Sequence, residues 1–308
     1  MTRWTASQIP DQTGRVAVVT GANGGLGLVT ALELARRGAE VVLACRDVAR
    51  GREAAAGIEA GVPAARVDVA RLDLADLASV RAFADAFPHD RLDLLVNNAG
   101  VMALPHRTTA DGFETQFGVN HLGHFALTGL LLPRVLATPG ARVITVSSFA
   151  HVLGNIDIHD LNSEQGYRRW TAYGRSKTAN LLFTHELARR LAAAGSDVVA
   201  ASAHPGYSAT NLTTAGPAME GRHTLRRLMR LADRAVAQTA EAGALPTLYA
   251  ATAPGVRPDS FTGPSFLMWR GAPAPSWRAP WTLDDRASAR LWAESERLTG
   301  VRYEGLKR

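Results

Sequence analysis

Tyr173 and Lys177 stand four residues apart in the stretch "YGRSK". The chain has 34 lysines and arginines together, yet only Lys177 and Lys307 are lysines. Residues i and i+4 share one face of a helix, so we expect both side chains on one face of a helix that begins near residue 170. A neighbouring ammonium favours the phenolate and lowers a tyrosine pKa from about 10. The pair therefore predicts proton transfer by Tyr173, with a surface Tyr–Lys pair as the alternative.

A glycine-rich turn follows the first apolar run, in "VVTGANGGLGLVTALELA". Its spacing is Gly21-x-x-x-Gly25-x-Gly27, which differs from the common G-x-G-x-x-G pattern. Glycines permit a tight turn and close approach of the backbone to a pyrophosphate at a helix N-terminus. The strand–turn–helix context predicts a dinucleotide site.

Arg46 closes the second apolar run, in "LACRD". An acid at this place would bind the ribose 2′-hydroxyl of NAD, whereas an arginine accommodates the 2′-phosphate of NADP. Asp47 comes next, and the turn has Asn23 and Gly24 where a second basic residue could stand. We expect NADP(H), with NAD(H) as the alternative.

Strand-like and helix-like segments alternate along the first two thirds of the chain. Consecutive apolar residues favour strands buried on both faces, and this alternation is typical of a parallel sheet. The predicted strands are 15–20, 40–45, 65–70, 91–97, 141–147 and 196–202. We expect one α/β domain over residues 1–308: a Rossmann-like, doubly wound parallel sheet with helices on both faces. The stretches 253–266 and 270–281 are interpreted as Gly/Pro-rich loops, and a last helix is expected at about 283–299.

Composition excludes several classes of protein. A single cysteine, Cys45, rules out an intrachain disulfide and a multi-cysteine zinc site. No apolar run is long enough for a signal peptide or a membrane span, so we expect a cytoplasmic protein. The net charge of +6 comes from dispersed arginines, which argues against a nucleic-acid partner. His121 and His124 lack an acidic cluster nearby, so we interpret them as core or surface histidines and expect no metal.

Further motifs occur in order along the chain: "NNAG" at 97–100, Asn120 in "VNHLGHFALT", "VSS" at 146–148 and "HPGYSAT" at 204–210. Together with the glycine turn and Tyr173-x-x-x-Lys177, they resemble the short-chain dehydrogenase/reductase family, in its Ser-Tyr-Lys branch. The stretches "ACRD", "SSFAH" and "RLWAESERLTG" resemble in particular the retinol dehydrogenase and WW-domain oxidoreductase-like group.

The resemblance implies a hydride transfer between NADP(H) and an apolar carbonyl or alcohol, a carbonyl reductase or dehydrogenase activity. Tyr173 would be the general acid or base and Lys177 would lower its pKa. Ser148 would bind the substrate oxygen, with Ser147 as the fallback, and Asn120 would anchor a water beside Lys177. Implied cofactor contacts are Gly21, Asn23, Gly25, Leu26, Gly27, Arg46, Asp73, Leu74, Asn97, Ala99, Gly100, Tyr173, Lys177, Pro205, Gly206 and Thr210.

Other expectations concern the substrate mouth and assembly. Residues 150–170 are expected to border the mouth, and residues 207–236 to form a lid whose basic amphipathic part, 222–236, could instead dock on a membrane. Family members often assemble through the helices that carry Asn120 and Tyr173, so a homo-oligomer is expected. The alternative functions are an NAD-dependent alcohol dehydrogenase and a non-catalytic NADP-binding sensor.

Overall fold

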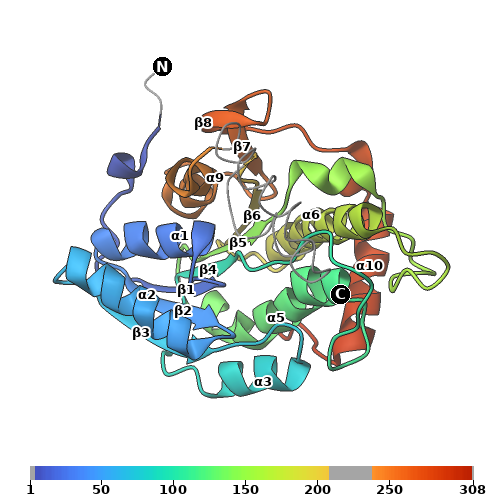
Figure 1. The fold of residues 1–308 in the computed structure, drawn as a ribbon, viewed down its shortest axis with the longest axis horizontal. Helices are drawn as coiled ribbons and strands as arrows, with labels where there is room; N and C mark the ends of the chain where they lie inside the picture. The colour runs from blue at the N-terminus through green and yellow to red at the C-terminus, as the bar shows by residue number, and fades with distance from the viewer. Residues whose placement is uncertain (1–3, 208–237, 307–308) are drawn as a thin grey trace, which may run out of the picture.

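An eight-stranded sheet organises the chain in the computed structural model, which describes residues 4–207 and 238–306. Its strand order is β3-β2-β1-β4-β5-β6-β7-β8, and every neighbouring pair is parallel except β7 and β8 (Figure 1). The strands are β1 (Val16–Thr20), β2 (Glu40–Cys45), β3 (Arg66–Arg71), β4 (Leu94–Asn97), β5 (Arg142–Val146), β6 (Val199–Ala203), β7 (Phe261–Phe266) and β8 (Arg270–Pro275). The order reverses between β1 and β4, which creates a crevice at the carboxyl ends of these strands.

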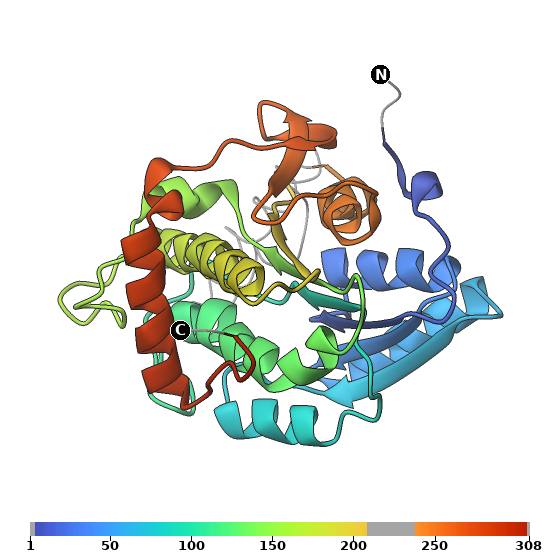
Figure 2. The same ribbon diagram turned by 180° about the vertical axis from the view of Figure 1, so that it is seen from behind.

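Helices cover both faces of the sheet (Figures 1 and 2). One face carries α1 (Gly25–Arg36), α2 (Val48–Gly61) and α9 (Ala240–Thr252). The other carries α3 (Leu77–Asp85), α5 (Gly123–Leu136) and α6 (Arg169–Ala193), with α10 (Asp285–Thr299) packed against α6. Shorter pieces are η1 (Ala6–Gln8), α4 (Thr115–Phe117), a π-helical turn η2 (Gly118–Leu122), η3 (Phe149–Leu153) and η4 (Pro280–Leu283). The predicted doubly wound α/β fold is confirmed.

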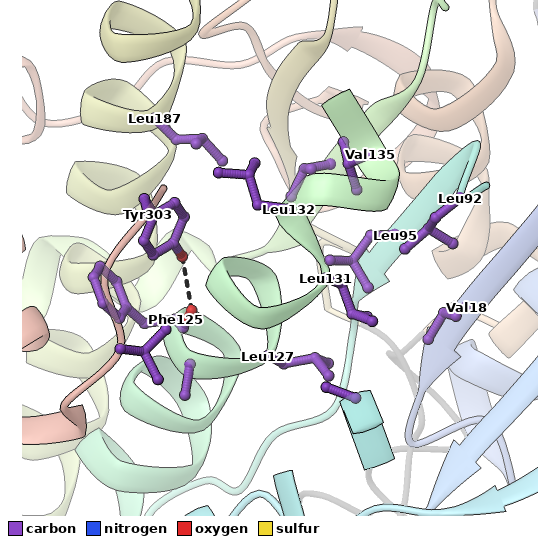
Figure 3. Packing of buried hydrophobic residues seen from close by; sticks show 14 of the residues in the cluster. Val18, Leu92, Leu95, Phe125, Leu127, Leu131, Leu132, Val135, Leu187 and Tyr303 are labelled. Carbon is purple, nitrogen blue, oxygen red and sulfur yellow. Dashed lines mark hydrogen bonds between the residues drawn. The ribbon is translucent and has the colours of Figure 1, made fainter. Parts of the chain in front are cut away.

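The central strands are buried on both faces, as their continuous apolar runs predict. In β1, Val18 joins the core beneath α5, whereas Val19 joins the core beneath α1. Figure 3 shows the first of these cores, to which α5 contributes Phe125, Leu127, Leu131, Leu132 and Val135. The labelled residues are Val18, Leu92, Leu95, Phe125, Leu127, Leu131, Leu132, Val135, Leu187 and Tyr303.

The C-terminal segment covers an outer part of α5 and α6. The indole of Trp292 stacks on Phe183 with 5.8 Å between ring centroids. The Tyr303 hydroxyl donates a 2.7 Å hydrogen bond to the carbonyl of Phe125 (Figure 3). Association of two chains through α5 and α6 would have to use what α10 leaves uncovered.

The interpretation of residues 253–266 and 270–281 as loops was wrong in part, because β7 and β8 form a hairpin there. Pro273 and Pro275 lie in the edge strand β8, where proline is tolerated, and Pro264 of β7 lies beyond the residues that pair with β6. Helix α9 was also not predicted, since Pro246 interrupts its helical pattern. Thr210, the lid residues 208–236 and Lys307 lie outside the described residues.

Within residues 4–207 and 238–306, none of the helices combines the length and the apolar character that crossing a bilayer requires.

Candidate active site

The glycine turn joins β1 to α1 at the carboxyl edge of the sheet. Gly21 and Gly25 have φ angles of +66° and +55°, in the left-handed region that favours glycine. A Cβ atom on Gly27 would lie only 2.6 Å from the carbonyl oxygen of Gly21. Gly24 precedes α1 without a side-chain cap, so the first N–H groups of the helix are left for a ligand. This arrangement suits a pyrophosphate at the helix N-terminus.

Thr20 ties the turn to the segment that follows β4. Its buried hydroxyl oxygen accepts hydrogen bonds from the backbone N–H groups of Asn98 and Ala99, each at 2.9 Å. The Asn98 side chain returns a 2.7 Å bond to the Thr20 carbonyl. Gly21, Asn98 and Ala99 are thereby held together beside the crevice. The resemblance implies that Asn97 to Gly100 line the adenosine side of the cofactor, and this range includes Asn98.

His124 completes this junction from α5. Its Nδ1–H donates to the carbonyl of Asn120 at 3.1 Å, so its Nε2 accepts from the Thr20 hydroxyl at 2.9 Å. Burial lowers the pKa of His124 to about 4, and burial likewise lowers that of His121 to about 3. Both are neutral, hydrogen-bonded core histidines, which agrees with their interpretation from sequence.

Asn120 lies in the π-helical turn η2, an irregularity often found at functional sites. Its Oδ1 accepts from the Val101 N–H at 2.7 Å. Its Nδ2 donates to the Val101 carbonyl and to Ser176 Oγ, both at 2.9 Å. The side chain therefore links the loop after β4 to α6. A Cβ atom on Gly100 would lie 3.1 Å from Asn120 Oδ1 and 3.5 Å from Lys177 Nζ, which brings these three predicted residues together.

Tyr173 and Lys177 lie one turn apart on α6 and both are buried. Lys177 Nζ lies 5.7 Å from the centre of the Tyr173 ring and donates to the Val146 carbonyl at 3.1 Å. Burial lowers the pKa of Lys177 to about 8. Burial raises the pKa of Tyr173 to about 12, and a hydrogen bond with Ser148 opposes that rise. Burial therefore sets the direction of the Tyr173 pKa, which is opposite to the lowering expected from Lys177.

The two serines after β5 have different hydrogen-bond partners. Ser148 is half-buried and hydrogen-bonds Tyr173, while its Oγ also accepts from the Ala150 N–H at 3.1 Å. Ser147 is buried and donates its hydroxyl to the carbonyl of Lys177 at 2.8 Å. Of the two serines, Ser148 is therefore the one in hydrogen-bond contact with Tyr173.

Arg46 and Arg50 are exposed on the far side of the glycine turn. Arg46 directly follows β2, as predicted. Asp47 caps α2 by accepting from the Arg50 N–H at 3.1 Å. The Arg50 guanidinium lies 3.9 Å from the place of a Cβ atom on Gly24. Arg50 thus places a second basic group beside the turn. It was not predicted from the sequence, because it reaches the turn only through the packing of α2.

The remaining cofactor contacts that were predicted are spread over neighbouring loops. Asp73 follows β3 and accepts from the Ala75 N–H at 3.0 Å, and Leu74 packs against Gly123. Gly206 follows β6 with a φ of +64° and lies against the carbonyl of Trp269. The side chain of Asn97 is buried and donates to Thr128 Oγ1 at 3.0 Å on the α5 side.

One group of side chains in the described residues could offer ligands to a metal ion: Glu40, Asp68 and His89. Glu40 begins β2 and Asp68 lies early in β3, so this group sits at the amino edge of the sheet. It lies at the opposite edge from Tyr173, and it has no part in the candidate active site.

Comparison with known proteins agrees with this geometry. A family model described as short chain dehydrogenase matches residues 15–221. The chain belongs to the short-chain dehydrogenase family. This family membership makes it an oxidoreductase, and it confirms the resemblance seen in the motifs.

Relatives extend the likeness of this short-chain dehydrogenase to nearly the whole chain. It is 45% identical to human retinol dehydrogenase 12 over 304 residues, which cover 97% of this chain and 90% of that protein. Identity to human retinol dehydrogenase 13 is 43%, over 94% of this chain and 85% of that protein.

Solved structures agree on the fold. An uncharacterised protein from Mycobacterium paratuberculosis has a TM-score of 0.82 and 48% identity, over 98% of this chain and 99% of that one. Pseudomonas aeruginosa RhlG, solved as an NADP active-site complex, has a TM-score of 0.61 and 27% identity, over 80% of this chain and 92% of that one.

Proposed function

We propose that this short-chain dehydrogenase interconverts a carbonyl and an alcohol on an apolar small molecule, with NADP(H) as the hydride donor or acceptor. One observation carries the proposal: Tyr173 is hydrogen-bonded by Ser148, has Lys177 one turn along its helix, and belongs to the loop-and-helix cluster beside the glycine turn. Retinol dehydrogenases among the relatives support a retinoid-like apolar substrate.

The residues around the crevice fit NADP(H). The uncapped start of α1 and the bare Gly21–Gly27 turn would hold the pyrophosphate. Arg46 and Arg50 would bind the 2′-phosphate as charged donors, and Lys177 would hold the nicotinamide ribose. The cofactor supplies the hydride, and the protein supplies orientation and a proton.

Tyr173 and Ser148 would act on the substrate oxygen. A phenol whose pKa is raised to about 12 is protonated at neutral pH, which is the form that gives a proton to a carbonyl oxygen. Ser148 would donate a hydrogen bond to the same oxygen and steady the developing charge. Lys177, buried with a pKa lowered to about 8, would hold its proton less firmly than a surface lysine and so could return one to Tyr173.

Cofactor choice is tested by fluorescence titration with NADPH and, separately, with NADH. We expect tighter binding of NADPH, and we expect Arg50→Ala or Arg46→Ala to weaken NADPH binding by about tenfold or more, since each removes a charge-assisted bond of about 1.5–3 kcal/mol. NADH binding should hardly change. Arg52→Ala is the matched control, because it removes the same charge from an exposed position on α2. Equal effects on both cofactors would remove the 2′-phosphate argument.

Chemistry is tested with an apolar aldehyde such as retinal and NADPH. Tyr173→Phe should lower kcat about 100-fold or more, as loss of a general acid does, while NADPH still binds. Unchanged turnover in this variant would contradict the mechanism. NADPH binding by the unaltered protein without turnover of any aldehyde tried would favour the sensor instead.

A further inference from the structure

The β7–β8 hairpin ends in a turn made of apolar residues. Phe266 pairs with Arg270, and the Trp269 N–H donates to the Phe266 carbonyl at 2.8 Å. Leu267 and Met268 are the central residues, with φ angles of +49° and +57°. A turn with two positive φ values favours Asn-Gly or Asp-Gly, because most side chains are strained there. Backbone preference therefore does not account for leucine and methionine at this turn.

Exposure to water does not account for the apolar residues at this turn either. Leu267 is 80% exposed and Phe266 is 57% exposed. A turn that is strained and also presents apolar side chains to water points to a contact made outside the fold.

The tip belongs to a larger apolar rim. In the part of the chain that the structure describes, the exposed large apolar side chains all come from η3, the start of α6, the hairpin, the segment after β8, and η4: Val152, Leu153, Trp170, Phe266, Leu267, Trp269, Trp277 and Leu283. Figures 1 and 2 show η3, η4 and the hairpin along one side of the molecule, away from α3.

Two tryptophans of this rim have an exposed arginine close to them in the sequence. Exposed Arg168 stands two residues before Trp170, and exposed Arg270 follows Trp269 directly. The Arg270 guanidinium lies 5.9 Å from the centre of the Phe266 ring. Tryptophan and arginine side by side suit the boundary between hydrocarbon and headgroups, where the indole lies at the interface and the guanidinium meets phosphate. The net charge of +6 favours an anionic surface.

The hairpin is anchored beside the candidate active site. The Tyr207 N–H donates to the Trp269 carbonyl at 3.1 Å, and the two rings stack with centroids 4.9 Å apart. Tyr207 follows Pro205 and Gly206, the predicted cofactor contacts after β6. A surface that held the hairpin tip would therefore lie close to the crevice.

We propose that the β7–β8 hairpin tip inserts into the headgroup layer of an anionic bilayer and docks the rim of the crevice on it. A turn that projects from the surface can enter a headgroup layer, whereas a groove cannot. Delivery of an apolar substrate from the bilayer rests on the proposed function, but the docking itself does not.

Flotation with phosphatidylglycerol-containing vesicles, and with phosphatidylcholine vesicles alone, tests the docking. The unaltered protein should float with the anionic vesicles and much less with the neutral ones. The double variant Leu267→Asn/Met268→Gly should bind about tenfold more weakly, because an apolar anchor is lost. Its thermal midpoint should be equal or higher, since Asn-Gly suits this turn. Leu267→Phe, the matched control, should retain binding.

Turnover of a water-soluble aldehyde should be the same for the double variant and the unaltered protein, so a failure of docking and a failure of the proposed chemistry are read separately. No flotation of the unaltered protein, or equal flotation of the double variant, would overturn the proposal. A change of oligomeric state in the double variant, measured by light scattering, would overturn it in favour of a second copy as the partner.

Discussion

Removing one hydroxyl at the end of β1 should destabilise the whole fold. Thr20→Val keeps the shape of a fully buried side chain but removes its oxygen. That oxygen accepts from the N–H groups of Asn98 and Ala99 and donates to Nε2 of His124. Asn98 keeps a second acceptor, the Val96 carbonyl at 2.9 Å, whereas the Ala99 N–H and His124 Nε2 lose their hydrogen bonds to Thr20.

The expected cost follows from these bonds. Each buried group left unpaired costs about 1–3 kcal/mol, so two such groups predict a loss of about 2–6 kcal/mol in the free energy of unfolding. Urea unfolding followed by tryptophan fluorescence measures this loss.

Thr30→Val is the matched control for this experiment. Thr30 is equally buried, but its hydroxyl donates only to the Leu26 carbonyl within α1, at 2.8 Å. Its removal should cost below about 1 kcal/mol, because the carbonyl belongs to a helix that already pairs it. Equal losses for the two variants would refute the reasoning that Thr20 ties β1 to the segment after β4.

Two further predictions concern the serines and a charged histidine. Ser148→Ala should lower kcat about 100-fold with little change in the free energy of unfolding, whereas Ser147→Ala should lower that free energy by about 1 kcal/mol through loss of its helix bond; the reverse assignment would contradict the site. The pKa of His185 is raised, chiefly by its hydrogen bond to Asp259 at 2.7 Å and also by Asp285. Its stabilising effect is therefore complete below the unfolded pKa of about 6.5 and is lost as pH rises through the folded value, so His185→Gln should cost more stability at about pH 5.5 than at about pH 8.5 in urea unfolding. A cost independent of pH would show that the pKa of His185 is the same in the folded and the unfolded chain.

The central strands were predictable because burial on both faces leaves a continuous apolar run in the sequence. The predicted strand at 40–45 matches β2 (Glu40–Cys45), and the predicted last helix ends, as expected, before Gly300 in the left-handed region. The hairpin β7–β8 was not predictable by this signal, because it lies at the edge of the sheet and contains proline. Local pattern is a weak guide where a strand has only one partner or little burial.

Some residues of the candidate site are likewise predictable from local sequence, and others depend on tertiary packing. Tyr173, Lys177 and the glycine turn are recognisable because helix periodicity and turn chemistry act over a few residues. Arg50 is not recognisable, since its place above Gly24 depends on how α2 packs back against the turn. The direction of the Tyr173 pKa also depends on burial, which spacing along one helix does not report.

The contact between Tyr303 and Phe125 joins residues 178 positions apart. On a ribosome, α5 and α6 are made long before Trp292 and Tyr303 emerge to cover them. During that interval the C-terminal segment does not yet cover the apolar side chains around Phe125 and Phe183. Exposed apolar side chains of this kind favour chaperone binding and aggregation. Any fragment that stops before Asp285 would keep that face open permanently. Burial of this part of the core therefore waits for the C-terminal segment.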